Sequence, residues 1–264
     1  MRDDSNRPAG IAKRGPLRHI SRISNTGRMM IRRVLKSLEE REKALRKSFG
    51  HDITDPVERR KSYWHVRWLD HGIFRTFWHN FEEIAPGVYR SNQPDHKRFA
   101  AYAKLGIKGV LNLRGEAKQP HYLFEVESTE KLGLELITVG LSARKAPKAK
   151  PLLQLISAFD TIQRPFLIHC KSGADRTGLA AALYLMIHEG KTVDAVRNQL
   201  SFRYLHIRRS STGVLDHFLD MYAARNAQDP IGIVDWITTE YDPQVLTESF
   251  AAKQAALKPW QGWR

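Results

Sequence analysis

The chain has 264 residues, of which 42% are hydrophobic and 27% are charged, and its formal net charge is +15. This length is enough to bury the core of one large domain, and no apolar run approaches the ~20 residues that span a bilayer. The single cysteine excludes an intrachain disulfide and a cysteine-rich zinc site. We therefore expect a protein of a reducing compartment, most simply the cytoplasm, with anionic partners.

The polar and basic composition of residues 1–60 predicts an N-terminal extension outside the main domain. Residues 1–26 contain several prolines, glycines and serines and lack hydrophobic periodicity, which is typical of disorder. Residues 27–48 match a basic amphipathic helix, because apolar side chains recur at helical spacing among lysines and arginines. The extension therefore presents positive charge and few apolar side chains.

An aromatic-rich segment follows at residues 61–81. With a break near Gly72, aromatic side chains share one helical face at Trp64, Trp68, Phe74 and Trp78. We expect this stripe to pack against its own domain. The alternative is peripheral contact with a membrane surface, to which the preceding basic helix would contribute.

Residues 82–242 alternate strand and helix signals. Strands are expected at residues 84–90, 107–113, 134–141 and 165–170. Helices are expected at residues 95–105, 121–132, 148–162, 177–189, 192–204 and 212–227. A tail at residues 243–264 contains one weak helix, at 245–257. The alternation predicts an α/β domain whose central, mostly parallel sheet is flanked by helices in three layers.

The most informative segment is residues 169–178, His-Cys-Lys-Ser-Gly-Ala-Asp-Arg-Thr-Gly, which follows an apolar strand and begins an apolar helix. The five residues between Cys170 and Arg176 allow the chain to form a cup whose backbone N–H groups point at a tetrahedral dianion. Gly173 permits the sharp bend, and Arg176 donates to two oxygens at once. A helix N-terminus and a nearby cation favour the thiolate, so Cys170 is predicted to be a nucleophile.

This segment resembles the HCxxxxxR(S/T) signature of the protein tyrosine phosphatase superfamily. With residues 88–94 (VYRSNQP) and 110–115 (VLNLRG), it is similar to the bacterial branch of dual-specificity-like phosphatases over roughly residues 82–225. The resemblance implies the three-layer cysteine-phosphatase fold. It also implies hydrolysis of phosphomonoesters through a phosphocysteine intermediate, with no metal and no other cofactor.

The resemblance assigns roles within the loop. Cys170, Arg176 and Thr177 are the implied catalytic residues, and the Thr177 hydroxyl is expected beside the sulfur. The residues implied to bind the substrate phosphate are Lys171, Ser172, Gly173, Ala174 and Gly178. Arg90 and Arg114 follow strands, where we expect them to stabilise the sheet through hydrogen bonds; the alternative is that they line the pocket. His169 is expected to shape the loop by hydrogen bonding rather than to act as a base.

The general acid departs from the family pattern. Dual-specificity phosphatases carry an aspartate on a separate loop before the cysteine, but the corresponding residues 140–147 (GLSARKAP) contain no carboxylate. Asp175 directly precedes Arg176, an arrangement that resembles myotubularin lipid phosphatases. We expect Asp175 to protonate the leaving group and later to activate water. The alternative is that Asp175 only hydrogen-bonds the loop or an outer partner.

Three functional classes follow from these features. The favoured class is a dual-specificity-like phosphatase for phosphotyrosine in proteins. The second acts on phosphoinositides, inositol polyphosphates or another anionic lipid, because Lys171 follows the cysteine and the N-terminal region is basic and aromatic. The third is an inactive phosphate-binding module, against which the presence of Cys170, Arg176 and Thr177 argues. No motif indicates nucleic-acid binding, and a peripheral location at the membrane accompanies the second class.

Overall fold

The computed structural model describes residues 33, 37, 52–70, 72–116 and 119–257. The chain divides into two units, residues 1–45 and 46–264. The disorder predicted for residues 1–26 lies outside the described residues, and so does the predicted helix at 27–48 apart from Arg33 and Ser37, which are helical. Within the described residues, no helix is both long and apolar enough to cross a membrane.

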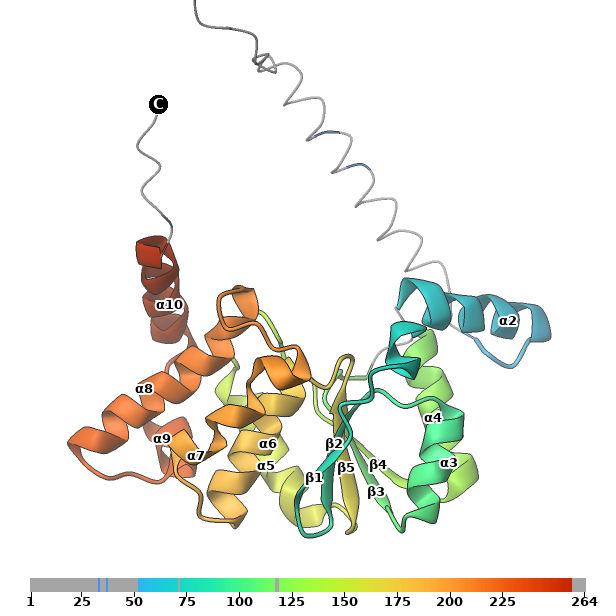
Figure 1. The fold of residues 1–264 in the computed structure, drawn as a ribbon, viewed down its shortest axis with the longest axis horizontal. Helices are drawn as coiled ribbons and strands as arrows, with labels where there is room; N and C mark the ends of the chain where they lie inside the picture. The colour runs from blue at the N-terminus through green and yellow to red at the C-terminus, as the bar shows by residue number, and fades with distance from the viewer. Residues whose placement is uncertain (1–32, 34–36, 38–51, 71, 117–118, 258–264) are drawn as a thin grey trace, which may run out of the picture. The chain divides into compact units, whose positions relative to one another are not determined.

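The central sheet has five strands in the order β1-β2-β5-β3-β4 (Figure 1). Their bounds are β1 (Glu82–Ala85), β2 (Val88–Asn92), β3 (Gly109–Asn112), β4 (Glu135–Thr138) and β5 (Phe166–Cys170). β1 pairs with β2 antiparallel, whereas β2 with β5, β5 with β3, and β3 with β4 are parallel. The mostly parallel sheet is therefore confirmed.

Helices cover both faces of the sheet (Figure 1). On one face lie α3 (His96–Lys104) and α4 (Pro120–Leu132). On the other face lie α5 (Ala149–Thr161) and α6 (Asp175–His188), around which pack α7 (Val193–Val196), α8 (Val214–Gln228) and α9 (Ile233–Thr239). α10 (Pro243–Leu257) contacts α8. This arrangement confirms the predicted three layers.

β5 shows how the sequence divides between the two faces. Phe166, Ile168 and Cys170 belong to the core cluster on the side of α5 and α6, whereas Leu167 belongs to the cluster that contains Phe99 of α3. The side chains alternate because successive residues of a strand point to opposite faces. All four of these β5 side chains are buried, as expected for a central parallel strand covered on both sides.

Two element predictions are wrong in part. The single strand expected at 84–90 is a hairpin, because the chain reverses at Gly87, whose φ of 72° is one that glycine adopts readily. The helix expected at 192–204 ends at Val196 and is followed by short 3-10 turns. There, the backbone carbonyl and side chain of Gln199 accept hydrogen bonds from Arg90, so tertiary contacts replace the helical ones. The sequence analysis missed α9.

The aromatic segment does not pack as expected. α2 (Pro56–Trp64) continues into a π-helical turn, His65–Leu69. Trp64 and Trp68 stack on each other with ring centroids 6.0 Å apart, but they are 58% and 49% exposed. Trp78 is also exposed, and the side chain of Phe74 lies outside the described part of the chain. Packing of this stripe against its own domain is therefore wrong for the three tryptophans.

Candidate active site

The predicted phosphate-binding loop connects β5 to α6. Cys170 is the last residue of β5 and Asp175 is the first of α6, so the cysteine lies below the N-terminus of a 14-residue helix. Gly173 has a φ of 71°, and a Cβ at this position would lie 2.6 Å from the Asn92 nitrogen and 2.7 Å from the Ser91 oxygen. The loop therefore needs glycine here for two reasons, the left-handed backbone and the close approach of β2.

Arg90 of β2 holds the loop in place through a hydrogen bond to its backbone. Its side chain is fully buried and donates 2.7 Å to the carbonyl of Gly173 and 3.1 Å to that of Gln199. The guanidinium carbon lies 3.4 Å from the centroid of the Tyr204 ring. Burial lowers the pKa of Arg90 to about 10, which still leaves it charged at neutral pH. Arg90 thus has the structural role that the sequence analysis expected.

Cys170 lies in surroundings that favour the thiolate. The side chain is 1% exposed, and burial by itself would raise the pKa of the thiol. The positive charge of Arg176 and the hydroxyl and amide of Thr177 act in the opposite direction and leave the pKa of Cys170 below its ordinary value. The buried Thr177 hydroxyl has no oxygen or nitrogen partner among the described residues, so it is available to the sulfur.

Several N–H groups of the Arg176 guanidinium make no hydrogen bond to the described residues. Nη1 makes one long contact, 3.4 Å from the carbonyl oxygen of Leu113, and the buried Nε has no partner within the described part of the chain. A guanidinium next to a buried thiol and with unused N–H groups is suited to receive two oxygens of a phosphate. The other predicted loop residues lie around it: Ser172 is exposed, whereas Gly173, Ala174 and Gly178 are buried.

Lys171 points to an internal carboxylate. Its ammonium lies 3.1 Å from Asp70 Oδ1, and Arg114 approaches the same carboxylate with two nitrogens, both at 2.9 Å. Arg75 Nη1 lies 3.0 Å from Asp70 Oδ2. Burial would raise the pKa of Asp70, but these three cations hold it well below its usual range. The cluster carries three positive charges against one negative charge, and the Arg114 side chain contacts Asp70 and Gln93 rather than a strand residue.

His169 has the shaping role that was expected. Its Nε2 lies 2.6 Å from Glu125 Oε1, and both side chains are buried. Gln93 Nε2 donates 2.8 Å to the other carboxylate oxygen of Glu125. Neither Glu125, within α4, nor Asp70, which follows the π-helical turn, was identified from the sequence, because neither belongs to a local motif.

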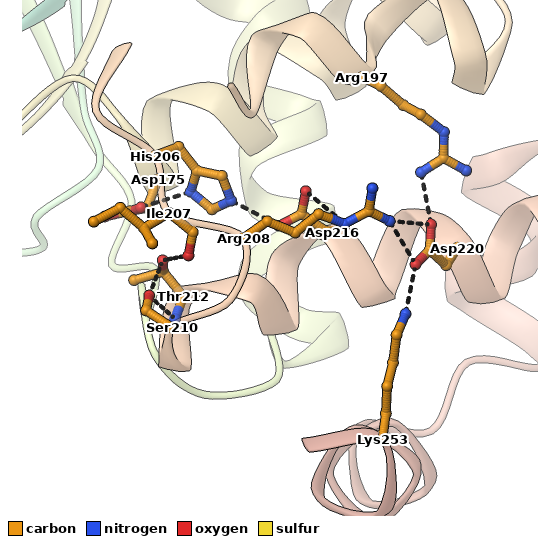
Figure 2. A network of polar contacts seen from close by, with 10 residues as sticks. All are labelled: Asp175, Arg197, His206, Ile207, Arg208, Ser210, Thr212, Asp216, Asp220 and Lys253. Atoms are coloured by element: carbon orange, nitrogen blue, oxygen red, sulfur yellow. Dashed lines mark hydrogen bonds and ion pairs between the residues drawn. The ribbon is translucent and has the colours of Figure 1, made fainter. Parts of the chain in front are cut away.

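The Asp175 side chain contacts a histidine from a later segment of the chain (Figure 2). Its Oδ1 lies 2.7 Å from His206 Nδ1, and His206 Nε2 lies 2.6 Å from Asp216 Oδ2. Burial would lower the pKa of His206, but the two carboxylates raise it to about 9. The sequence analysis found neither His206 nor Asp216, which lie more than 30 residues beyond Asp175 in the chain.

A cavity of about 590 Å³ lies between α2 and the pair α3 and α4, and none of residues 170–178 lines it. Arg75, Arg98 and His121 are among its walls. Burial, followed by the charge of Arg114, lowers the pKa of His121 to about 3, so this imidazole is neutral. The loop residues therefore do not line this cavity, although its wall residue Arg75 belongs to the Asp70 cluster that Lys171 also contacts.

Comparisons with known proteins place the central part of the chain. A family model described as "DSP-PTPase phosphatase fused to NAD+ Kinase" matches residues 79–213. Inositol diphosphatase DSP2 of Oryza sativa subsp. japonica is 30% identical over 104 residues, 38% of this chain and 50% of that protein. Human phosphatidylglycerophosphatase and protein-tyrosine phosphatase 1 is 27% identical over 131 residues, 47% of this chain and 64% of that protein.

The chain spans about half the length of the rice relative. Among solved structures, TpbA of P. aeruginosa is similar with a TM-score of 0.46 and 18% identity, over 66% of this chain and 91% of that one.

Proposed function

Since the chain belongs to the dual-specificity phosphatases of the protein tyrosine phosphatase superfamily, we propose that it hydrolyses phosphomonoesters through a phosphocysteine intermediate. One observation carries the proposal. The buried Cys170 thiol has a lowered pKa and lies at the N-terminus of α6, beside an Arg176 guanidinium with unused donors. A thiolate, inward-facing amides and a two-pronged cation are what attack on a phosphate dianion requires.

The proposed reaction has two steps. In the first, the Cys170 thiolate attacks phosphorus, the S–P bond forms, and the bond to the leaving oxygen breaks as that oxygen takes a proton from Asp175. In the second, water attacks phosphorus, gives its proton to Asp175, and the S–P bond breaks to release inorganic phosphate and the thiolate. Arg176 and the loop amides bind the phosphate oxygens in both steps, and Thr177 donates a hydrogen bond to the departing sulfur.

The favoured substrate is phosphotyrosine in a protein. Asn80 Nδ2 donates to the Ser172 carbonyl at 2.8 Å and to the Tyr204 carbonyl at 3.0 Å, so it joins two chain segments to the loop. These segments carry the exposed aromatic side chains of Trp78 and Phe202. Aromatic side chains beside a phosphate site suit an aryl phosphate. A single cysteine that must stay reduced suits the cytoplasm.

A second candidate is a phosphoinositide, an inositol polyphosphate or another anionic lipid. The cluster of Lys171, Arg114 and Arg75 around Asp70 leaves two positive charges uncompensated next to the loop, where a further phosphate would bind. The rice relative is named as an inositol diphosphatase, and the human relative as both a phosphatidylglycerophosphatase and a protein-tyrosine phosphatase. The exposed Trp64 and Trp68 would then contact the membrane surface.

The test compares the wild type with Cys170→Ser on phosphotyrosine peptides, phosphoserine peptides, soluble inositol polyphosphates and phosphoinositide vesicles. We expect Cys170→Ser to lose turnover on every substrate and to retain binding of tungstate. The kcat/KM ratios of the wild type then choose between the two candidates. Full hydrolysis by Cys170→Ser would contradict the proposal, and unchanged tungstate binding without wild-type turnover would indicate the inactive module.

A further inference from the structure

His206 is a buried side chain that contacts Asp175, the aspartate directly before Arg176 (Figure 2). Its side chain is fully buried and touches a carboxylate at each ring nitrogen, Asp175 at 2.7 Å and Asp216 at 2.6 Å. The Asp216 carboxylate accepts from Nε2, and Asp175 Oδ1 accepts from Nδ1 whether or not Oδ2 carries a proton, so both ring nitrogens donate and the ring is an imidazolium. The pKa of about 9 agrees with this geometry.

Asp216 is itself fixed by a second set of ion pairs. Arg208 Nε lies 3.7 Å from Asp216 Oδ1, and the same guanidinium contacts Asp220 at 3.1 Å. Asp220 also receives Arg197 at 2.6 Å and Lys253 at 3.0 Å (Figure 2). The charged groups that face His206 are therefore Asp175 from α6 and Asp216 from α8, and of the cations beyond them Arg208 contacts Asp216.

The backbone also directs His206 inward. Leu205, the preceding residue, has a φ of 66°, which is uncommon for a residue with a Cβ. The turn is closed by two backbone hydrogen bonds, from the Leu205 N–H to the Phe202 carbonyl at 2.8 Å and from the His206 N–H to the Ser201 carbonyl at 3.1 Å. Such conformations persist where the surrounding structure fixes them, and they concentrate at functional sites.

Only one oxygen of Asp175 is used in this arrangement. Oδ1 accepts from His206, whereas no hydrogen bond reaches Oδ2 from the described residues, and the Asp175 side chain is 20% exposed. We propose that His206 is a positioning residue for Asp175: it occupies Oδ1 and leaves Oδ2 to exchange the catalytic proton. This role rests on the proposed function.

The proton balance follows from the two-step reaction. Asp175 enters the first step protonated on Oδ2, gives this proton to the leaving oxygen, and regains one from water in the second step, which restores the acid. His206 keeps both of its protons throughout, and its positive charge stabilises the Asp175 carboxylate between the two steps. The histidine therefore never contacts the substrate and acts only through Asp175.

The experiment is a double-mutant cycle with two aryl phosphates that differ in leaving group. His206→Gln is measured alone and in the Asp175→Asn background, on phenyl phosphate and on 2,4-dinitrophenyl phosphate. Because phenol needs protonation and dinitrophenol does not, we expect His206→Gln to lower kcat/KM ~10–100-fold on phenyl phosphate and only slightly on the dinitro ester. In the Asp175→Asn background, His206→Gln should have no further effect.

His217→Gln is the matched control, because this histidine lies on α8 beside Asp216 but hydrogen-bonds Ser249 of α10 rather than a loop residue. It should leave both substrates unchanged. Asp216→Asn, which keeps His206, should reproduce a weaker form of the leaving-group dependence and serves if His206→Gln does not fold.

Equal losses on the two esters, or the same loss with and without Asp175, would overturn the positioning role alone. A wild type that hydrolyses neither ester contradicts the proposed function, and the role of His206 with it.

Discussion

At the residue scale, the state of Cys170 depends on its neighbour Arg176. The arginine is the strongest influence that lowers the pKa of the thiol, against the burial that raises it. Its own side chain is otherwise weakly engaged, with one 3.4 Å contact to Leu113. The pair therefore forms an electrostatic unit in which one residue supplies charge and the other nucleophilicity.

Arg176→Met should raise the pKa of Cys170, because burial raises this pKa and the positive charge that most strongly lowers it is removed. We expect the inflection in the rate of iodoacetamide alkylation to move to higher pH, and kcat/KM to fall by a factor of ~10² or more. Arg164→Met is the control, since Arg164 is exposed and precedes β5 at the end opposite Cys170. An alkylation profile unchanged by Arg176→Met would show that Arg176 does not set the state of the thiol.

A comparison of Gly173 with Gly190 distinguishes the close approach of neighbouring backbone atoms to a glycine from the strain of its left-handed backbone. Both have a left-handed backbone, with φ values of 71° and 61°, but a Cβ at Gly190 would meet nothing within 4 Å. Gly173→Ala should displace the loop and lower kcat/KM by ~10² or more, because small misplacements at a reacting centre are costly. Gly190→Ala shares the strain and should leave kcat/KM unchanged. Similar kinetics for the two variants would mean that Ser91 and Asn92 do not constrain the loop.

Much of the candidate site could be predicted from one continuous segment. The nucleophile, the arginine and the glycine bend all lie in residues 169–178, where spacing reports geometry directly. The contacts that complete the site come from elsewhere in the chain. Asp70 with Lys171, Glu125 with His169 and His206 with Asp175 meet only after folding. No periodicity or local motif reports such pairs.

At the element scale, the difference between local signals and contacts made only after folding explains why the strand expected at 84–90 and the helix expected at 192–204 were wrong in part. The hairpin of β1 and β2 is marked locally by Pro86 and Gly87, so this break could have been read from the sequence. The early end of α7 could not, because residues 197–204 are shaped by Arg90 of β2. One buried arginine thus links a strand, the cysteine loop and a segment that follows α7.

Arg90→Met should destabilise these elements together. It removes the donors to Gly173 and Gln199 and leaves buried acceptors unpaired, at roughly 1–3 kcal/mol for each acceptor. Urea unfolding should show a stability loss above about 2 kcal/mol. Arg203→Met is the control, because this arginine is 71% exposed and lies over the same Tyr204 ring at 5.5 Å. Equal losses for the two variants would contradict the structural role of Arg90.

At the scale of the whole molecule, the charge balance changes between the surface and the interior. The chain carries 43 lysines and arginines against 28 aspartates and glutamates. The buried groups near the loop are nevertheless paired with groups of opposite charge, as in the imidazolium of His206 between Asp175 and Asp216. Stability should therefore depend on pH through these interior groups, whose pKa values change on folding.

His206 gives a pH dependence whose sign can be derived. Folding raises its pKa from about 6.5 to about 9, so its contribution is fully present below pH ~6.5 and is lost as the pH rises through ~9. The contribution is on the order of 3 kcal/mol at its maximum. Cys170, with a lowered pKa, acts in the opposite direction, because its contribution is present at high pH and lost at low pH. Measurements in a Cys170→Ser background isolate the histidine.

In that background, urea unfolding between pH 6 and pH 9.5 should show stability falling as the pH rises. His206→Gln should remove most of this slope, because glutamine carries no titrating proton. His217→Gln should retain the slope, since burial lowers the pKa of His217 and folding therefore does not favour its protonated form. The same slope with and without His206 would mean that the ring is not an imidazolium in the folded protein, and the hydrogen-bonding pattern assigned to Asp175 would then be wrong as well.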